Sequence, residues 1–289
     1  MSYAFYRNAH LSKVFITDLD GTLLDAKGSL SDFSKSNLKE LLKRDDFKFT
    51  VATGRDFYLM RSPLRGFNFK IPLISNDGAY VASIDQGKSL YVENITWGCL
   101  CDIYSYFKSN GFSIFFKVVH NGEVFNAYDG INNFLEHWYL TFKQTFCCSN
   151  IIKINKLNDI FLYDVLSVTV IGIREIIESA FLNMKNYSEL KVSKYGRIEF
   201  NDKISVIEVQ SIHAEKINGI KFLADYLSIS YKDIVYFGDS DNDISVFNEN
   251  EIHKVTPKNG IDTLKNKACE VIDYHYNDSV VKYILNNFK

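Results

Sequence analysis

The sequence contains only three prolines among its 289 residues, and it has no long apolar segment. No uninterrupted apolar run approaches the roughly 18 residues that a membrane-spanning helix needs, so we expect no membrane partner. The first residues, MSYAFYRNAHLSK, lack the apolar core of a signal peptide, which predicts a cytoplasmic protein. Because 35 acidic residues nearly balance 33 basic ones, the charge gives no reason to expect a nucleic acid as partner.

The number and spacing of the cysteines do not fit a disulfide framework or a metal site. Five cysteines in a chain of this length do not make a disulfide framework. Cys99 and Cys101 are separated by one residue, and Cys147 and Cys148 are adjacent. Neither spacing is the Cys-x-x-Cys pair that is typical of zinc sites. We therefore interpret the cysteines as reduced, partly buried thiols.

Strands and helices alternate at both ends of the chain. Buried parallel strands are predicted from short apolar runs, at 14–19, 47–52, 71–74 and 234–237. Helices are predicted between and after them, at 31–42, 57–64, 215–227, 241–247, 261–267 and 279–287. Short strands are also expected near Lys254 and Val271. This alternation indicates a parallel sheet built from βαβ units.

The middle of the chain follows a different pattern. Strands and hairpins are predicted there at 80–83, 89–93, 113–119, 123–128 and 166–171, and around Lys191, Arg197 and Ser205. Helices are predicted at 97–110, 132–142 and 175–186. At this length two domains, or one domain with a large insertion, are expected. We therefore predict an α/β fold with a doubly wound, Rossmann-like core of residues 1–82 plus 210–289 and an inserted α+β cap of residues 83–209.

Two aspartates lie at the C-terminal end of the first predicted strand, in the segment Asp18-Leu19-Asp20-Gly21. Because residues two apart in a strand point to the same side, both carboxylates can face one site. They lie at the C-terminal end of the strand, where open α/β sheets bind ligands. Two neighbouring carboxylates need a cation or a shared proton between them, and Mg²⁺ prefers such oxygen ligands. The alternative is an ordinary polar turn at the surface.

Two further positions offer phosphate-binding groups. Thr53 and Gly54 end the second predicted strand, and a hydroxyl beside backbone N–H groups suits phosphate oxygens, although Thr-Gly often just ends a strand. Lys216 lies at the start of a predicted helix, and lysine binds phosphate as a point charge. A lone helical lysine is more often a solvated surface charge, so its interpretation depends on the other segments.

A second acidic segment, Gly238-Asp239-Ser240-Asp241-Asn242-Asp243, follows the strand predicted at 234–237. Its alternating aspartates could indicate a calcium loop. Such a loop requires glycine at its sixth position and glutamate at its twelfth. Those positions hold Ile244 and Asn250, so the calcium interpretation is excluded.

These four segments, in this order, resemble the four motifs of the haloacid dehalogenase (HAD) superfamily. The insertion after Asn76-Asp77-Gly78-Ala79 resembles the large α+β cap of its Cof-type sugar-phosphate phosphatases, and the resemblance covers nearly the whole chain from about Lys13 onward. It implies magnesium-dependent hydrolysis of small phosphate monoesters, such as sugar phosphates or related metabolites, through an aspartyl phosphate. The partner it implies is a small phosphorylated metabolite.

The resemblance also implies roles for the acidic residues. Asp18 matches the nucleophile that becomes phosphorylated. Asp20 matches the acid that protonates the leaving alcohol and then the base that activates water. The implied magnesium ligands are Asp18, the backbone carbonyl of Asp20, and Asp239. Asp243 matches a carboxylate that orients Lys216 or a metal-bound water.

The remaining matches are contacts to phosphate. They are Thr53, Gly54, Lys216 and Asn242, together with the backbone N–H of Leu19. The chain departs from the family pattern around Lys216, where Glu215 precedes and Ile217 follows it. Glu215 could weaken Lys216 electrostatically, although a helix N-terminus tolerates a carboxylate.

Two other functions stay open at this point. A phosphotransferase or phosphomutase would use the same motifs but pass the phosphoryl group to an acceptor other than water. A non-catalytic regulator that binds a phosphorylated ligand would be marked by loss of Asp18 or Asp20, and both are present. Asp20 also argues against a pump-like ATPase, whose aspartyl phosphate must persist.

Overall fold

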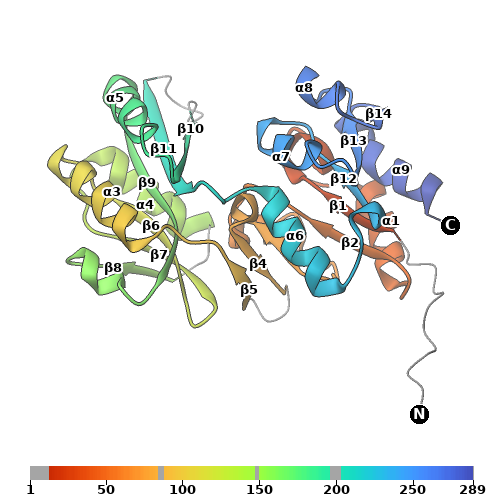
Figure 1. Ribbon diagram of the computed structural model, residues 1–289, viewed down its shortest axis with the longest axis horizontal. Helices are drawn as coiled ribbons and strands as arrows, with labels where there is room; N and C mark the ends of the chain where they lie inside the picture. The colour runs from red at the N-terminus through yellow and green to blue at the C-terminus, as the bar shows by residue number, and fades with distance from the viewer. Residues whose placement is uncertain (1–12, 84–87, 147–149, 196–202, 289) are drawn as a thin grey trace, which may run out of the picture. The chain divides into compact units, whose positions relative to one another are not determined.

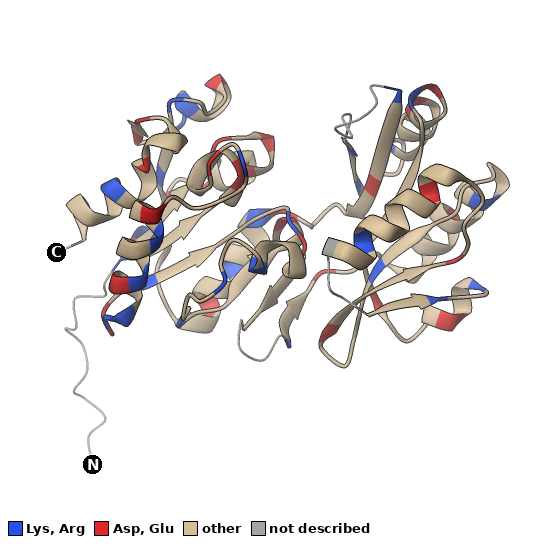
Figure 2. Cartoon of the chain, turned by 180° about the vertical axis from the view of Figure 1, so that it is seen from behind, with Lys and Arg blue, Asp and Glu red and all other residues tan. Residues whose placement is uncertain are grey.

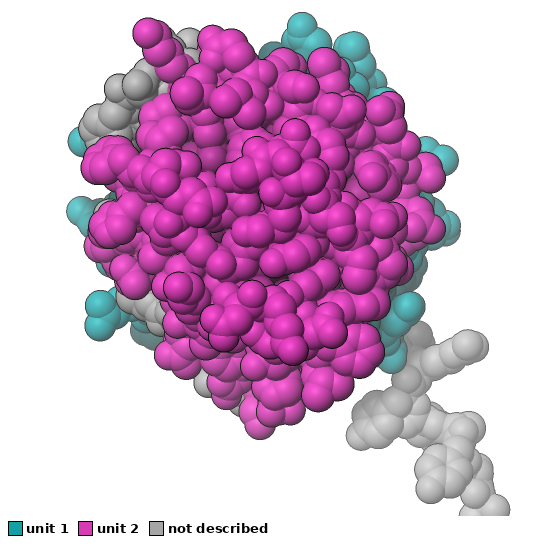
Figure 3. Space-filling model, turned by 90° about the vertical axis from the view of Figure 1, so that its left-hand side faces the viewer, with its two compact units in different colours: residues 1–53, 63–73, 220–289 teal, residues 54–62, 74–219 magenta. Residues whose placement is uncertain are grey.

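The computed structural model describes residues 13–83, 88–146, 150–195 and 203–288. The chain forms two compact units (Figure 3). Unit 1 contains residues 1–53, 63–73 and 220–289, and unit 2 contains residues 54–62 and 74–219. The predicted domain boundaries, after residue 82 and before residue 210, stay a prediction.

Unit 1 contains a five-stranded sheet in the order β14-β13-β12-β1-β2 (Figure 1). The strands are β1 (Val14–Thr17), β2 (Lys48–Val51), β12 (Ile234–Phe237), β13 (His253–Pro257) and β14 (Glu270–Ile272). Every adjacent pair is parallel, and β1 lies between β12 and β2. All four residues of β1 and of β12 are buried, as expected for strands covered on both faces.

Helices connect these strands, as the sequence predicts. The helices that lie wholly in unit 1 are α1 (Asp32–Lys43), α7 (Ile244–Phe247), α8 (Asp262–Lys265) and α9 (Ser279–Asn287). The Ser31 side chain accepts a hydrogen bond from the Ser34 N–H and so caps α1. Leu38, Leu41 and Leu42 form its buried stripe.

Unit 2 contains a six-stranded sheet in the order β10-β11-β9-β6-β7-β8. Its strands are β6 (Phe115–His120), β7 (Glu123–Tyr128), β8 (Ile151–Lys153), β9 (Asp164–Ile173), β10 (Leu190–Tyr195) and β11 (Ile204–Ser211). Among the described residues of this sheet, β7 and β8 pair in parallel and the other neighbouring strands pair antiparallel. A smaller sheet contains β3 (Leu73–Ser75), β4 (Tyr80–Ala82) and β5 (Ser89–Val92).

Helices cover both faces of the six-stranded sheet. On one face, α3 (Trp97–Ser109) and α5 (Arg174–Met184) pack on a cluster that includes Phe116. On the other face, α4 (Phe134–Phe146) packs through Leu140 on Phe115. Successive residues of a strand point to opposite faces, which is why adjacent phenylalanines belong to separate clusters. The remaining helices are α2 (Phe57–Arg61) and α6 (Lys216–Leu227).

The predicted fold class, a parallel α/β core with an additional sheet domain, is confirmed. The helix predicted at 57–64 is shorter, since α2 ends at Arg61 and Pro63 follows closely. The predicted strand around Arg197 and the cysteine pair at 147–148 lie outside the described residues. Acidic and basic residues are interspersed along both units (Figure 2). Among the helices of the described residues, none has the length and apolarity to cross a bilayer.

Candidate active site

The turn after β1 carries the first two predicted aspartates. Asp18 is 4% exposed, and its N–H donates to the Phe237 carbonyl of the neighbouring strand, at 2.8 Å. The turn over Leu19–Leu23 is closed by a 2.8 Å bond from the Leu24 N–H to the Leu19 carbonyl. Asp20 is exposed on this turn. One carboxylate is therefore buried at the strand end, and the other can reach a bound molecule.

The structure brings Asp18 together with two aspartates from the fourth motif. Ligand atoms of Asp18, Asp239 and Asp243 all lie within 4.8 Å of one another. The reason is topological: β1 and β12 are adjacent and parallel, with Thr17 opposite Phe237, so both strands end at the same edge of the sheet. Residues 221 positions apart (239 minus 18) thus share one site.

Hydrogen bonds hold the fourth-motif loop in place. The Asp243 carboxylate accepts from the Tyr236 hydroxyl at 2.6 Å and from the N–H groups of Asp239 and Ser240 at 2.8 and 3.0 Å. The Thr22 hydroxyl donates to Asp239 Oδ1 at 2.9 Å, which ties the first motif to the fourth. Sequence reasoning missed Thr22, although its place directly after Gly21 was the available signal.

The donor chemistry of this cluster fits a magnesium ion. All three candidate ligand groups are carboxylates, which supply the oxygen donors that Mg²⁺ prefers. Three negative charges so close together, on residues that are buried or half-buried, require a cation or shared protons to be stable. Asp243 also supports its own loop through three hydrogen bonds, as an orienting carboxylate would.

Gly21 has no room for a side chain. Its φ of +73° is left-handed, and a Cβ atom there would lie 2.2 Å from Asp239 Oδ2. We expect Gly21→Ala to cost about 1–3 kcal/mol of unfolding free energy, because of backbone strain, and to displace the Asp239 carboxylate. Chemical denaturation measures the first effect and magnesium titration the second.

Gly98→Ala is the matched control, because an added Cβ at Gly98 in α3 meets nothing within 4 Å. It should leave stability unchanged or raise it by up to about 1 kcal/mol. Equal behaviour of the two variants would contradict the close packing of Gly21 on Asp239.

The other predicted phosphate contacts fall in both units. In unit 1, Leu19 and Thr53 are buried, and the Asn242 side-chain oxygen accepts from the Ser240 hydroxyl at 2.9 Å. Gly54 and Lys216 belong to unit 2. The convergence of these two residues with the Asp18 cluster stays a prediction.

Lys216 is not a solvated surface charge. It is 0% exposed at the start of α6, which rules out the alternative interpretation of this lysine. The Gly78 backbone lies so near that a Cβ at Gly78 would be 2.2 Å from the Glu215 carbonyl oxygen. The chain leading into α6 is thus held tightly against the Asn76–Gly78 turn.

Unit 2 contains a buried ion pair that the sequence did not reveal. Lys117 Nζ lies 2.6 Å from Asp56 Oδ2, and Lys143 Nζ lies 3.7 Å from the same oxygen. Burial would raise the pKa of Asp56, but the charges of the two lysines outweigh it and hold that pKa well below its usual range. Asp56 also caps α2 by accepting from the N–H groups of Tyr58 and Leu59.

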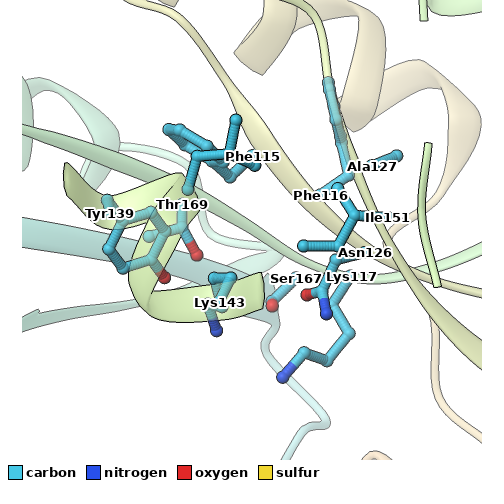
Figure 4. A pocket seen from close by; sticks show the side chains of 11 residues that line it. Phe115, Phe116, Lys117, Asn126, Ala127, Tyr139, Lys143, Ile151, Ser167 and Thr169 are labelled. Atoms are coloured by element: carbon cyan, nitrogen blue, oxygen red, sulfur yellow. The ribbon is translucent and has the colours of Figure 1, made fainter. Parts of the chain in front are cut away.

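The two lysines line a small pocket between α4 and the six-stranded sheet (Figure 4). The polar residues lining it include Asn126, Ser167 and Thr169. In Figure 4 the Lys117 and Lys143 side chains extend away from the Phe115 ring.

The predicted hairpin turn at His120-Asn121-Gly122 is also present, with Asn121 and Gly122 at positive φ, as expected for this turn type.

A family model for haloacid dehalogenase-like hydrolases matches residues 15–284. The chain belongs to this family. The predicted family is thereby confirmed. Relatives that are named as phosphatases confirm the predicted enzyme class, a HAD-like phosphatase.

Individual proteins resemble the chain over most of its length. Phosphatase YwpJ of Bacillus subtilis is 24% identical, with 81% of this chain and 85% of that protein covered. The phosphatase YitU of the same organism, named for 5-amino-6-(5-phospho-D-ribitylamino)uracil, is 22% identical, with 94% and 96% covered. A solved HAD subclass IIB sugar phosphatase matches with a TM-score of 0.67 at 19% identity, covering 95% and 98%.

Proposed function

We propose that this HAD phosphatase hydrolyses a small phosphate monoester, such as a sugar phosphate or a related metabolite, through an aspartyl phosphate on Asp18. The observation that carries the proposal is the cluster of Asp18, Asp239 and Asp243, with ligand atoms within 4.8 Å of one another. Asp20 stands two residues beyond Asp18, exposed on the turn, where an acid or base can reach a bound substrate.

In the first step Asp18 acts as the nucleophile. A carboxylate oxygen of Asp18 forms a bond to phosphorus while the bond from phosphorus to the ester oxygen breaks. Asp20 gives its proton to the departing oxygen. The products are the free alcohol, an aspartyl phosphate on Asp18, and an ionised Asp20.

In the second step Asp20 acts as the base. It takes a proton from a water molecule, whose oxygen bonds to phosphorus as the bond from phosphorus to Asp18 breaks. Inorganic phosphate leaves, the Asp18 carboxylate is regenerated, and Asp20 again carries its proton. An acid/base in this position gives the intermediate a short lifetime.

Magnesium is the proposed cofactor. The proposed ligands are Asp18, the main-chain carbonyl of Asp20, and Asp239, with Asp243 as support. When bound, Mg²⁺ supplies positive charge that offsets the charges of the carboxylates and the phosphoryl oxygens. Thr53, Gly54, Lys216, Asn242 and the Leu19 N–H are the proposed donors to the phosphoryl group.

Relatives support a small, hydroxylated substrate. One relative is named for a phosphorylated ribityl compound, and a protein of similar fold is a sugar phosphatase. Both names describe phosphate esters of sugars or sugar alcohols. A phosphorylated metabolite of that size is the proposed partner of this chain.

The proposal predicts magnesium-dependent phosphate release from a panel of phosphorylated sugars, sugar alcohols and nucleotides. Removal of divalent cations with EDTA should lower the rate at least about 100-fold, since the lost charge stabilisation amounts to several kcal/mol. Added Mg²⁺ should restore the rate. Isomerised product without free phosphate would indicate a mutase instead, and binding without turnover would indicate a regulator.

A further inference from the structure

Asn259 joins three separate segments of unit 1. It lies in the loop between β13 and α8, and it is half-buried. Its Nδ2 donates to the Gly21 carbonyl at 2.7 Å. Its Oδ1 accepts from the His275 N–H at 3.1 Å. Both ends of one side-chain amide are therefore used, and one of them reaches the turn that carries Asp20.

The backbone around the Gly21 carbonyl is restrained on both sides. Gly21 follows Asp20 directly and has a left-handed φ of +73°. Beyond it, the Thr22 hydroxyl is bound to Asp239 at 2.9 Å, and before it, the Asp18 N–H is bound to Phe237. The bond from Asn259 adds a third restraint, on the peptide group between Gly21 and Thr22, one residue beyond Asp20.

The loop that presents Asn259 is itself well fixed. The Gly260 N–H donates to the Pro257 carbonyl at 2.8 Å, and the Ile261 N–H donates to the Asp239 carbonyl at 2.9 Å. A Cβ at Gly260 would lie 2.2 Å from Thr256 Oγ1, so the loop packs closely. Asn259 thus connects this closely packed loop to the turn that carries Asp20.

We propose that Asn259 is a positioning residue that aims Asp20 at the leaving oxygen of the substrate by holding the Gly21 carbonyl. This inference rests on the proposed function. Asn259 does not belong to the carboxylate cluster, so its loss should misplace the acid and leave the carboxylates of Asp18 and Asp239 where they are. A misplacement of about 1 Å is enough to lower a rate about 100-fold.

The choice of leaving group distinguishes a positioning role of Asn259 from a merely structural one. An alkyl phosphate needs protonation of its leaving oxygen by Asp20, whereas p-nitrophenolate departs without it. The value of kcat/KM reports the steps up to release of the alcohol, before Asp20 acts as a base. Misplacement of the Asp20 side chain should therefore lower kcat/KM for the alkyl phosphate and leave kcat/KM for p-nitrophenyl phosphate nearly unchanged.

The test compares wild type, Asn259→Asp and Asn259→Ala on p-nitrophenyl phosphate and on the alkyl phosphate that wild type hydrolyses fastest. We expect kcat/KM to fall about 100-fold for the alkyl phosphate and less than about 5-fold for p-nitrophenyl phosphate. The Mg²⁺ affinity should fall less than about 10-fold, because the carboxylate ligands Asp18 and Asp239 keep their places and only the proposed main-chain ligand of Asp20 lies on the affected turn. Asn259→Asp is isosteric and keeps the acceptor for His275, so it carries the test if Asn259→Ala unfolds.

Asn287→Ala is the matched control. Its Nδ2 also donates to a main-chain carbonyl, that of Tyr283, at 2.9 Å in α9. It should leave both kcat/KM values within about 2-fold, because its hydrogen bond stays within α9 and does not reach the Leu19–Leu23 turn. Equal losses on the two substrates in Asn259→Asp, or no loss, would overturn the role of Asn259 alone. A wild type that releases no phosphate would refute the proposed function and this inference with it.

Discussion

Asp18→Asn is expected to lower phosphate release by at least about 10⁴-fold, because an amide cannot attack phosphorus to form the acyl phosphate. The loss should be the same for p-nitrophenyl and alkyl phosphates, since both need the nucleophile. Phosphate release under saturating Mg²⁺ measures it. Substantial turnover by this variant would contradict the assignment of the nucleophile.

A second measurement on the same variant keeps a folding defect apart from a catalytic one. Asn removes one of the three clustered negative charges at Asp18, Asp239 and Asp243. In EDTA, thermal unfolding of Asp18→Asn should therefore occur at the same or a higher temperature than that of wild type. Asp241→Asn is the matched control, because Asp241 is exposed in the same fourth-motif loop. Its activity should stay within about 2-fold of wild type.

Asp56→Asn is expected to lower the free energy of unfolding by about 3–5 kcal/mol, because it leaves the Lys117 charge buried without its carboxylate. The side chains of Asp56 and Lys117 are 3% and 6% exposed, so water cannot replace the lost interaction. Asparagine keeps an oxygen that can cap α2, which isolates the effect of charge. Urea denaturation measures the difference.

A double variant tests whether the cost comes from the unpaired charge. Adding Lys117→Met to Asp56→Asn should recover most of the lost stability, since it removes the charge left behind. Glu40→Gln is the control for an exposed pair: Glu40 and Lys43 are 68% and 71% exposed, and its effect should stay below about 1 kcal/mol. No recovery in the double variant would contradict the explanation.

The pH dependence of stability should also depend on Asp56. Its pKa is depressed in the folded state, so its contribution is present above the pKa of about 3.9 that an unfolded aspartate has. That contribution is lost as pH falls below this value toward the folded-state pKa. Wild type should therefore lose more stability than Asp56→Asn when both are brought from pH 5 to pH 2.

Local sequence patterns predicted most of the fold and part of the candidate site. Continuous apolar runs identified β1 and β12, because a strand covered on both faces has no polar alternation. The Asn-Gly pair at 121–122 identified the hairpin of β6 and β7, because this turn needs residues that tolerate positive φ. The motif aspartates could be named because a strand end followed by acidic residues is a local feature.

The contacts between distant residues could not be read in the same way. No local signal pairs Asp56 with Lys117 or Asn259 with Gly21, which are 61 and 238 residues apart. An Asn-Gly at 259–260 indicates only a turn, and a lysine in a strand normally points to water. Such side chains acquire their partners only when the chain is packed.

The sequence by itself determined the elements, the α/β class and the presence of carboxylates at two strand ends, because these depend on residue types and on spacing along the chain. Tertiary structure alone decided that Asp18, Asp239 and Asp243 meet, and that Asn259 holds the turn beside Asp20. The reason is physical: the strand order of the parallel sheet sets which strand ends are neighbours, and side chains from distant segments form hydrogen bonds only where packing has brought their groups together.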